Sequence, residues 1–498
     1  MNKIKKYIGA GMLGVLILSG SCTKDFQEIN TNPNTVLAAT PEALLGPALH
    51  DIVSRNQDRA MRIGNELMQY HVTTSDSREF HRYFIRPSEP DYMWRNWYLQ
   101  LTNIRDIYTN AENTRQPGYK TFKGISLVLD VWVSSMLTDM FGDVPYFEAA
   151  KGKEKIIQPK FDTQQAIYED LFKKLEEANV LFKEDQASLP AGRISMIPDA
   201  IRTLDPLFSG ETLKWRKFGN SLYLRLLMRV SGKSVTNAPA KIAEIAVTNK
   251  ANYPIMAGNE DSAILRFTTA LPYVSAFNGD RDFDFNGDKG YTEFFINNLN
   301  AWDDPRLPKW STQASGVYAG IPSGYRAGQV PERQSTLLPA LKDEPLLGNI
   351  MNYGELQFIL AEAALKGYIT GSPEDFYNNG ITAAITFWIP DYANIATHLQ
   401  KEEIKWNASG TFDQQMEQIF LQKYYTLFFT DFQAWHEYRR TRHPVLPVGQ
   451  GLLNDGKMPS RFTYPVNVQS LNAANYREAV NRMGGDDLNV KVWWNTAD

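Results

Sequence analysis

The sequence predicts a mainly α-helical protein in which a loop-rich, irregular insertion with few short strands interrupts a scaffold of packed helices. The first observation is periodicity, because apolar residues recur every three or four positions and form one helix face. The members of that face are Ile167, Leu171, Leu175, Ala178 and Phe182. The second observation is that Gly and Pro recur throughout residues 268–345, which favours loops and short strands. Binding residues are usually found on loops that a rigid scaffold holds.

Length and composition limit the protein class. A chain of 498 residues can form one large domain or a few small ones. Hydrophobic residues make up 43% and charged residues 22%, which excludes wholesale disorder. The 52 basic residues against 56 acidic ones give no argument for nucleic-acid binding. Cys22 is the only cysteine, so the chain has no internal disulfide framework.

The first residues are typical of a bacterial lipoprotein signal. Three lysines precede an uncharged apolar run over residues 8–18, and small residues lead directly to Cys22. The apolar run is too short to cross a bilayer, which needs about 20 residues. We therefore expect residues 1–21 to be removed and residues 22–40 to form a polar leash. The alternative is an ordinary secretory signal with an incidental cysteine.

An acylated Cys22 would anchor the chain without a spanning helix. Each buried methylene of an acyl chain contributes ~0.8 kcal/mol to membrane binding, so a multiply acylated cysteine holds firmly. We expect the remaining residues, 41–498, to form one domain tethered by this lipid.

Two helices carry signals that the structure can test. Asp162 and Gln165 form a capping-box pattern before the apolar face described above. Residues 213–230 form a second helix, whose apolar positions alternate with a basic stripe. We interpret this stripe as the solvated side of a core helix. It consists of Arg216, Lys217, Arg225 and Arg229.

Further helices are expected at residues 353–366, 373–387 and 413–440. In the first two, small residues such as Gly367 and Gly380 recur at roughly the offsets of a tetratricopeptide helix hairpin. Small residues at a crossing point let two helices approach closely.

Residues that could carry catalysis form no recognisable motif. His436-Glu437 lacks the second His of a zinc-protease helix, and no G-x-S-x-G nucleophile turn is present. Carboxylates are abundant, but no spacing singles out a pair. We therefore expect no enzymatic activity and no required cofactor.

One segment matches a calcium-loop signature. Asp282, Asp284 and Asn286 alternate, a glycine follows, and Glu293 comes five residues later. Alternate oxygen ligands and a bidentate Glu suit Ca²⁺. The alternative is an acidic turn before a helix that begins near Thr292.

Aromatic residues in the loop-rich segment are the candidates for ligand contact. Flat rings with a polar edge suit the apolar faces of sugars, and equally peptide side chains. Five aromatic residues of this segment do not belong to a helical repeat of apolar positions: Tyr273, Phe277, Trp310, Tyr318 and Tyr325.

Six blocks in order along the chain resemble the SusD/RagB family of outer-membrane nutrient-binding lipoproteins from Bacteroidetes-type bacteria, and the SusD-like subgroup most of all. The blocks are residues 137–149, 161–168, 215–225, 304–307, 355–364 and 459–465.

The resemblance implies tetratricopeptide-like helix pairs as the scaffold, with Gly142, Asp143 and Pro145 in a structured turn. It implies a lipid-anchored protein of the outer membrane that faces the cell exterior and covers a TonB-dependent, SusC-like transporter barrel. The expected ligand is an oligosaccharide or a peptide. A surface-anchored glycan-degrading enzyme, or a structural lid with little recognition of its own, are the alternatives.

Overall fold

The structure is a computed structural model that describes residues 39–75 and 79–498. The predicted signal peptide, Cys22 and almost all of the predicted leash lie outside the described residues. Thr40–Asp498 forms one compact unit by itself.

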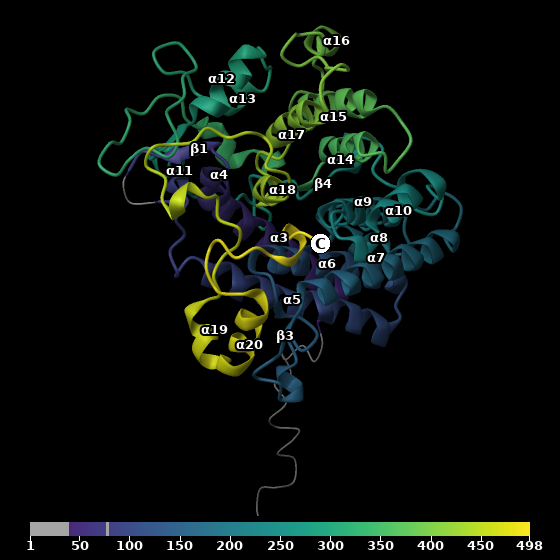
Figure 1. The fold of residues 1–498 in the computed structure, drawn as a ribbon. Coiled ribbons are helices and arrows are strands. Elements are labelled where there is room, and N and C mark those ends of the chain that lie inside the picture. The colour runs from purple at the N-terminus through teal and green to yellow at the C-terminus, as the bar shows by residue number, and fades with distance from the viewer. Residues whose placement is uncertain (1–38, 76–78) are drawn as a thin grey trace, which may run out of the picture. The chain divides into compact units, whose positions relative to one another are not determined.

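Helices dominate this unit, so the predicted fold class is confirmed (Figure 1). The longer helices are α3 (Pro41–Arg59), α5 (Pro90–Thr114), α6 (Tyr119–Phe141), α7 (Gln164–Ala187), α9 (Thr212–Arg229), α14 (Tyr353–Leu365), α15 (Pro373–Trp388), α17 (Phe412–Thr426), α18 (Gln433–Thr441) and α20 (Ala473–Met483). The shorter ones are α4 (Asn65–Leu67), α8 (Asp199–Arg202), α10 (Ala238–Ala243), α11 (Asp282–Asn286), α12 (Glu293–Ala301), α13 (Leu307–Trp310), α16 (Ile395–His398) and α19 (Val466–Leu471). Helices that follow one another pack side by side: α3 on α5, α5 on α6, α6 on α7 and α14 on α15.

Three two-stranded antiparallel sheets accompany the helices in the described chain. Strand β1 (His71–Thr73) pairs with β5 (Lys289–Tyr291), β2 (Val144–Pro145) with β3 (Phe161–Asp162), and β4 (Ala263–Ile264) with β6 (Asn349–Met351). The β1–β5 and β4–β6 sheets join segments that lie far apart in sequence, whereas the β2–β3 sheet joins the end of α6 to the start of α7.

The start of α7 differs from the predicted capping box. The N-cap is Thr163, whose hydroxyl accepts a hydrogen bond from Ala166 N at 3.2 Å. Asp162 lies in β3 instead, where its carboxylate accepts hydrogen bonds from the backbone N–H groups of Tyr146 and Phe147 at 3.0 and 2.9 Å. The prediction of Asp162 as the cap was wrong by one residue, because a strand ends there.

Helices α14 and α15 form the expected close hairpin. A Cβ atom at Gly380 would lie 2.7 Å from Cζ of Phe358, which is closer than two such atoms can approach. Glycine therefore allows the two helices to cross at this point. The small residues of the pattern have the packing role that the tetratricopeptide comparison predicted.

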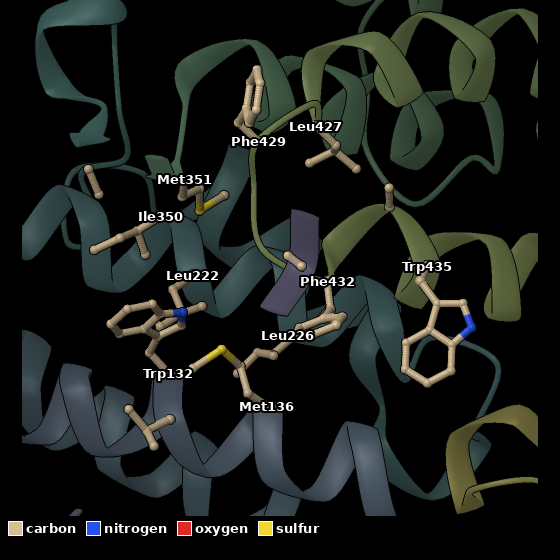
Figure 2. Packing of buried hydrophobic residues seen from close by; sticks show 14 of the residues in the cluster. Trp132, Met136, Leu222, Leu226, Ile350, Met351, Leu427, Phe429, Phe432 and Trp435 are labelled. Carbon is tan, nitrogen blue, oxygen red and sulfur yellow. The ribbon is translucent and has the colours of Figure 1, made fainter. Parts of the chain in front are cut away.

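The predicted helix 413–440 is two helices, α17 and α18. The chain between them leaves helical geometry at Phe429 and Asp431, where φ is 65° and 35°. This break directs apolar side chains into the core between α6, α9 and β6 (Figure 2). The side chains that meet there include Trp132 and Met136 of α6, Leu222 and Leu226 of α9, Ile350 and Met351 of β6, and Leu427, Phe429 and Phe432.

The basic stripe of α9 is mostly buried, so its interpretation as a solvated face was wrong. Arg225 forms a bidentate pair with Glu355 of α14, with N···O distances of 2.7 and 2.6 Å. Arg229 pairs with Asp139 of α6 at 2.5 Å. Both guanidinium groups are at most 2% exposed. Their partners lie about 90 and 130 residues away in sequence, where local periodicity gives no information about them.

Helix α6 is, within the described chain, the one helix long and apolar enough to cross a membrane by length and composition. Its apolar stretch is entirely buried inside the compact unit, as expected for a core helix.

Candidate functional site

Trp310, one of the five aromatic residues predicted to contact a ligand, is a core residue. It lies in α13 with an exposed fraction of 0%. Its ring centroid lies 5.4 Å from that of Trp388 and 5.2 Å from that of Phe428. A ring with no exposed surface cannot stack on a ligand, so the prediction of Trp310 as a platform was wrong. The surrounding Gly and Pro residues predicted irregular backbone, but backbone irregularity does not determine exposure.

Phe277 is likewise a packing residue in this structure. It is 7% exposed, and its ring centroid lies 5.3 Å from that of Phe285. Tyr273 and Tyr318 are partly exposed, and Tyr273 packs edge-on against His50. Neither tyrosine lines the hollow described next.

The loop-rich segment does form a hollow, with a volume of about 390 Å³, which we name the loop hollow. It is lined by residues 292–294, 322–326 and 447–450, together with Gln69 and Gln329. Two residues from the sequence predictions, Glu293 and Tyr325, meet here, although they belonged to two different predicted sites.

One wall of the loop hollow is fixed by the start of α12. Thr292 caps this helix, because its hydroxyl accepts a hydrogen bond from Phe295 N at 3.1 Å and donates one to the carbonyl of Gln69. The backbone N–H of Glu293 donates to the carbonyl of Ile321 at 2.9 Å. A Cβ at Gly320 would lie 2.4 Å from Glu293 N, so only glycine allows the loop to approach the helix end this closely.

The opposite wall consists of two loops in close contact. Gly451 N donates to the carbonyl of Gly324 at 2.7 Å, and Gln69 Nε2 donates to the carbonyl of Pro447 at 2.8 Å. Gly324 has a φ of +63°, which favours glycine, and a Cβ at Gly449 would lie 2.5 Å from the carbonyl oxygen of Gly324. The walls of the hollow are therefore held by the backbone itself.

Tyr325 is part of this framework. Its hydroxyl donates to the carbonyl of Thr73 at 2.6 Å, and its ring lies 4.3 Å from that of His81. Only 7% of the residue is exposed. Tyr325 thus positions residues 322–326 and leaves little ring surface for a ligand.

Phe294 is the aromatic that sequence reasoning missed. The buried face of α12 consists of Phe295, Ile296 and Leu299, and Phe294 lies beside that face, half-buried and lining the loop hollow. Its ring packs edge-on against Tyr424, with centroids 5.6 Å apart. The sequence signal that could have identified Phe294 was its position, as a large apolar residue, outside the apolar repeat of the helix.

Polar groups complete the lining. Glu293, Arg326, Gln329 and Gln450 are exposed. Within the described chain, neither Glu293 nor Arg326 forms an ion pair, and the buried hydroxyl of Ser323 has no hydrogen-bond partner. The hollow thus offers a carboxylate, a guanidinium and amides beside the ring of Phe294.

The four residues of the calcium signature do not converge. Asp282 and Asp284 lie in helix α11, where Asp282 pairs with Lys342 at 2.8 Å and Asp284 with Arg281 at 2.6 Å. Asn286 donates to the carbonyl of Leu337, and Glu293 lies beyond strand β5. Over residues 39–75 and 79–498, no group of three or more His, Cys, Asp or Glu side chains could hold a metal ion. The segment forms a helical turn and a strand in place of the predicted loop, and calcium binding stays a prediction.

The predicted turn at Gly142, Asp143 and Pro145 is present. Gly142 has a φ of 86°, and the carboxylate of Asp143 accepts hydrogen bonds from Gln164 N and Arg482 Nε at 3.0 and 2.7 Å. His436 is a buried structural histidine beside Arg439, and burial and the adjacent guanidinium hold the pKa of its ring well below the ordinary value.

Comparison with known proteins places these features in a family. Residues 33–465 match the SusD-like family model, described as starch-binding and associating with the outer membrane. No curated protein matches the chain. A SusD homolog from Bacteroides fragilis has 23% sequence identity and a TM-score of 0.77, and the match covers 92% of this chain and 100% of that one.

Two similar structures are described as chitin-binding. One is 26% identical with a TM-score of 0.76, covering 92% of this chain and 100% of its own. The other, a SusD homolog from Flavobacterium johnsoniae, is 18% identical with a TM-score of 0.77, covering 92% and 99%. The family match spans most of the sequence, and the chain therefore belongs to the SusD-like family of outer-membrane nutrient-binding proteins.

Proposed function

We propose that this protein is a lipid-anchored protein of the cell surface that captures an oligosaccharide in the loop hollow and delivers it to a TonB-dependent, SusC-like transporter. The observation that carries the proposal is the combination of a rigid hollow with unpaired polar groups. Sugar hydroxyls both donate and accept hydrogen bonds, which matches the carboxylate, guanidinium and amide groups of the lining. The ring of Phe294 supplies an apolar surface for one sugar face.

The two chitin-binding relatives favour N-acetylated amino sugars as the first ligands to test. A peptide remains the second candidate, since Glu293 and Arg326 also suit peptide termini and charged side chains. A screen of chitin oligosaccharides, starch oligosaccharides and short peptides by calorimetry distinguishes the two ligand classes.

The number of carboxylates in the loop hollow favours a protein that binds a sugar without hydrolysing it. Glycoside hydrolysis generally requires two carboxyl groups on either side of the scissile bond. Among the described residues that line the hollow, Glu293 is the only carboxylate. We expect purified protein to leave a bound oligosaccharide intact, and release of shorter sugars would instead favour the glycan-degrading alternative.

The ligand site is tested by truncating its aromatic ring. Phe294→Ala should weaken oligosaccharide binding by about 1–3 kcal/mol, because the ring loses its contact with the sugar face. Glu293→Gln should weaken binding through loss of a charged acceptor. Phe283→Ala is the matched control, since Phe283 is 72% exposed on α11 and does not line the hollow.

Unchanged affinity in both hollow variants, with unchanged melting temperature, would reject this site. Tyr273→Ala and Tyr318→Ala then test the two remaining exposed aromatics. A protein that binds no sugar or peptide but still associates with its transporter would be the structural lid.

The anchor is tested separately. Cys22→Ala should release the mature protein from the outer membrane, because no acyl chain can be attached. Fractionation of cells that lack the transporter measures this directly, and continued membrane association of the variant there would contradict lipidation at Cys22.

A further inference from the structure

A second hollow lies away from the loop-rich segment, and its lining is mostly apolar. Its volume is about 610 Å³. Its walls come from helix α5, from Pro145, Ala149, Ala150, Ile157 and Pro159, and from helix α19 with Asn472. We name it the α5–α19 groove. The side chains that matter for its chemistry are Arg95, Tyr98, Leu99, Ile157, Val468 and Leu471.

Large apolar side chains at this groove face solvent. Leu99 is 55% exposed, Leu471 is 70% exposed and Ile157 is 85% exposed. Single exposed apolar residues are common on soluble proteins, but several around one concave surface mark an interaction site. Each comes from a different wall, so the apolar surface is continuous across the groove.

The walls are joined by hydrogen bonds, so the groove is preformed. Gln158 Nε2 donates to the carbonyl of Leu471 at 2.9 Å, and Asn472 Nδ2 donates to the carbonyl of Pro159 at 2.7 Å. The hydroxyl of Tyr98 donates to the carbonyl of Pro145 at 2.6 Å. These bonds connect all three walls, and they hold the apolar residues in place at the surface.

The wall between α5 and α19 is also the most basic stretch near the groove. Residues 151–160 contain four exposed lysines and one glutamate, whereas the whole chain has a net charge of -4. None of the four lysines forms an ion pair within the described chain, and Arg95 adds a further exposed cation to the lining. The lysines are Lys151, Lys153, Lys155 and Lys160.

We propose that the α5–α19 groove and the lysines of residues 151–160 seat the protein body on an anionic lipid surface. Phosphate headgroups would contact the lysines and Arg95, while aliphatic chains would contact Ile157, Leu99 and Leu471. Apolar side chains next to unpaired cations complement a molecule that is anionic at one end and aliphatic at the other. This contact is separate from oligosaccharide capture in the loop hollow, and each can fail without the other.

The test uses the chain from residue 23 onward, which carries no cysteine and therefore no acyl group. Its body, Thr40–Asp498, is a compact unit of its own. Flotation with phosphatidylcholine vesicles, with and without phosphatidylglycerol, measures binding to a neutral and an anionic surface. We expect binding to the anionic vesicles alone, weakened by added salt.

Charge reversal tests the lysines. Because each lysine near an anionic surface strengthens binding about fivefold, the combined variant Lys151→Glu, Lys153→Glu and Lys155→Glu should bind at least about 100-fold more weakly. The matched control is the combined variant Lys250→Glu, Lys309→Glu and Lys405→Glu, three exposed lysines elsewhere on the body, which should bind as the parent does.

Probe attachment tests the apolar contact. Ile157→Cys supplies the only thiol, and an environment-sensitive dye there should shift to the blue on anionic vesicles. The same dye on Val235→Cys, a position 61% exposed outside the groove, should not shift. Absence of vesicle binding, equal binding to neutral vesicles, or equal loss in the control lysine variant would overturn the proposal. Loss of transporter association in the charge-reversed variant, with vesicle binding unchanged, would overturn it in favour of a protein partner.

Discussion

Charged side chains of the scaffold and of the loop hollow are held in opposite ways. In the scaffold, Arg225 and Glu355 are each 1% exposed, and two guanidinium nitrogens of Arg225 donate to the two carboxylate oxygens of Glu355. At the loop hollow, Glu293 and Arg326 are exposed and, within the described chain, form no ion pair. A buried charge must be paired because water no longer solvates it, whereas an exposed unpaired charge is available to a ligand. Whether a charged side chain stabilises the scaffold or is available to a ligand therefore depends on its partner more than on its residue type.

The buried charges form a connected network. Glu437 of α18 accepts hydrogen bonds from Lys423 of α17 and Arg440 at 2.7 and 2.8 Å, and Glu362 of α14 accepts from Arg440 at 2.6 Å. Burial alone would raise the pKa of Glu437, but Arg440, Lys423 and Arg229 hold it well below its ordinary value. The same balance lowers the pKa of Glu362 to about 2. Both carboxylates therefore remain charged and connect three helices.

We expect the removal of one buried cation to cause the largest loss of stability. Arg229→Ala leaves the buried Asp139 without its ion-pair partner and removes one cation from Glu437, so we expect the free energy of unfolding to fall by about 3–5 kcal/mol. Chemical denaturation measures it. Arg281→Ala is the control, because Arg281 pairs with Asp284 at the surface and should change stability little. Equal effects of the two substitutions would contradict the distinction between buried and exposed pairs.

Two aromatic residues extend the comparison. Trp310→Ala should lower stability by about 3–5 kcal/mol, because its ring is enclosed by other core rings and truncation leaves a cavity. Phe294→Ala should change oligosaccharide affinity with only a small loss of stability, since Phe294 is half-buried. Thermal melting and ligand titration of both variants test this. A Trp310→Ala protein of normal stability with weakened binding would restore Trp310 as a ligand platform.

These results show which parts of the molecule the sequence could predict. Helix periods and family blocks predicted the scaffold, because apolar positions recur locally. The partner of Arg225, Glu355, lies 130 residues away, so its burial depends on a tertiary contact that no local pattern contains. Trp310 was misassigned for the same reason, because its neighbour Trp388 belongs to a different helix. The loop hollow depends on the close approach of Gly324 to Gly449. The recurrence of glycine predicted loops, but it did not predict which loops contact each other.

Asp431 gives a smaller, pH-dependent test of the buried network. Burial raises its pKa to about 6, although Arg225 and Gln433 oppose the shift. Its Oδ2 atom has no hydrogen-bond partner in the part of the chain that the structure describes. Because the folded state holds the proton more tightly than the unfolded state, this group's contribution to stability is fully present only below the ordinary pKa of 3.8, and it is lost as the pH rises from there through about 6.

The substitution Asp431→Asn removes this titration. We expect it to raise the free energy of unfolding at pH 7.5 by on the order of 2 kcal/mol relative to the parent, with the gain shrinking below pH 6 and vanishing below the ordinary pKa of 3.8. Denaturation of both proteins across this pH range measures the difference. A gain that is constant with pH, or larger in acid, would show that the Asp431 carboxyl is not held in its neutral form.

The smallest expected effect concerns calcium at residues 282–293. Ca²⁺ needs six to eight oxygen ligands around one point, whereas Asp282 and Asp284 are engaged by Lys342 and Arg281, and Glu293 lies at the loop hollow on the far side of β5. Binding would require both ion pairs to open and α11 to unwind. We therefore expect millimolar CaCl₂ to leave the melting temperature within about 1 °C of the chelator-treated value, since a ligand stabilises the folded state appreciably only when its concentration exceeds its Kd. A larger shift that Asp282→Asn with Asp284→Asn abolishes would establish the calcium loop, and would place a cation beside the same Glu293 that we assign to oligosaccharide binding.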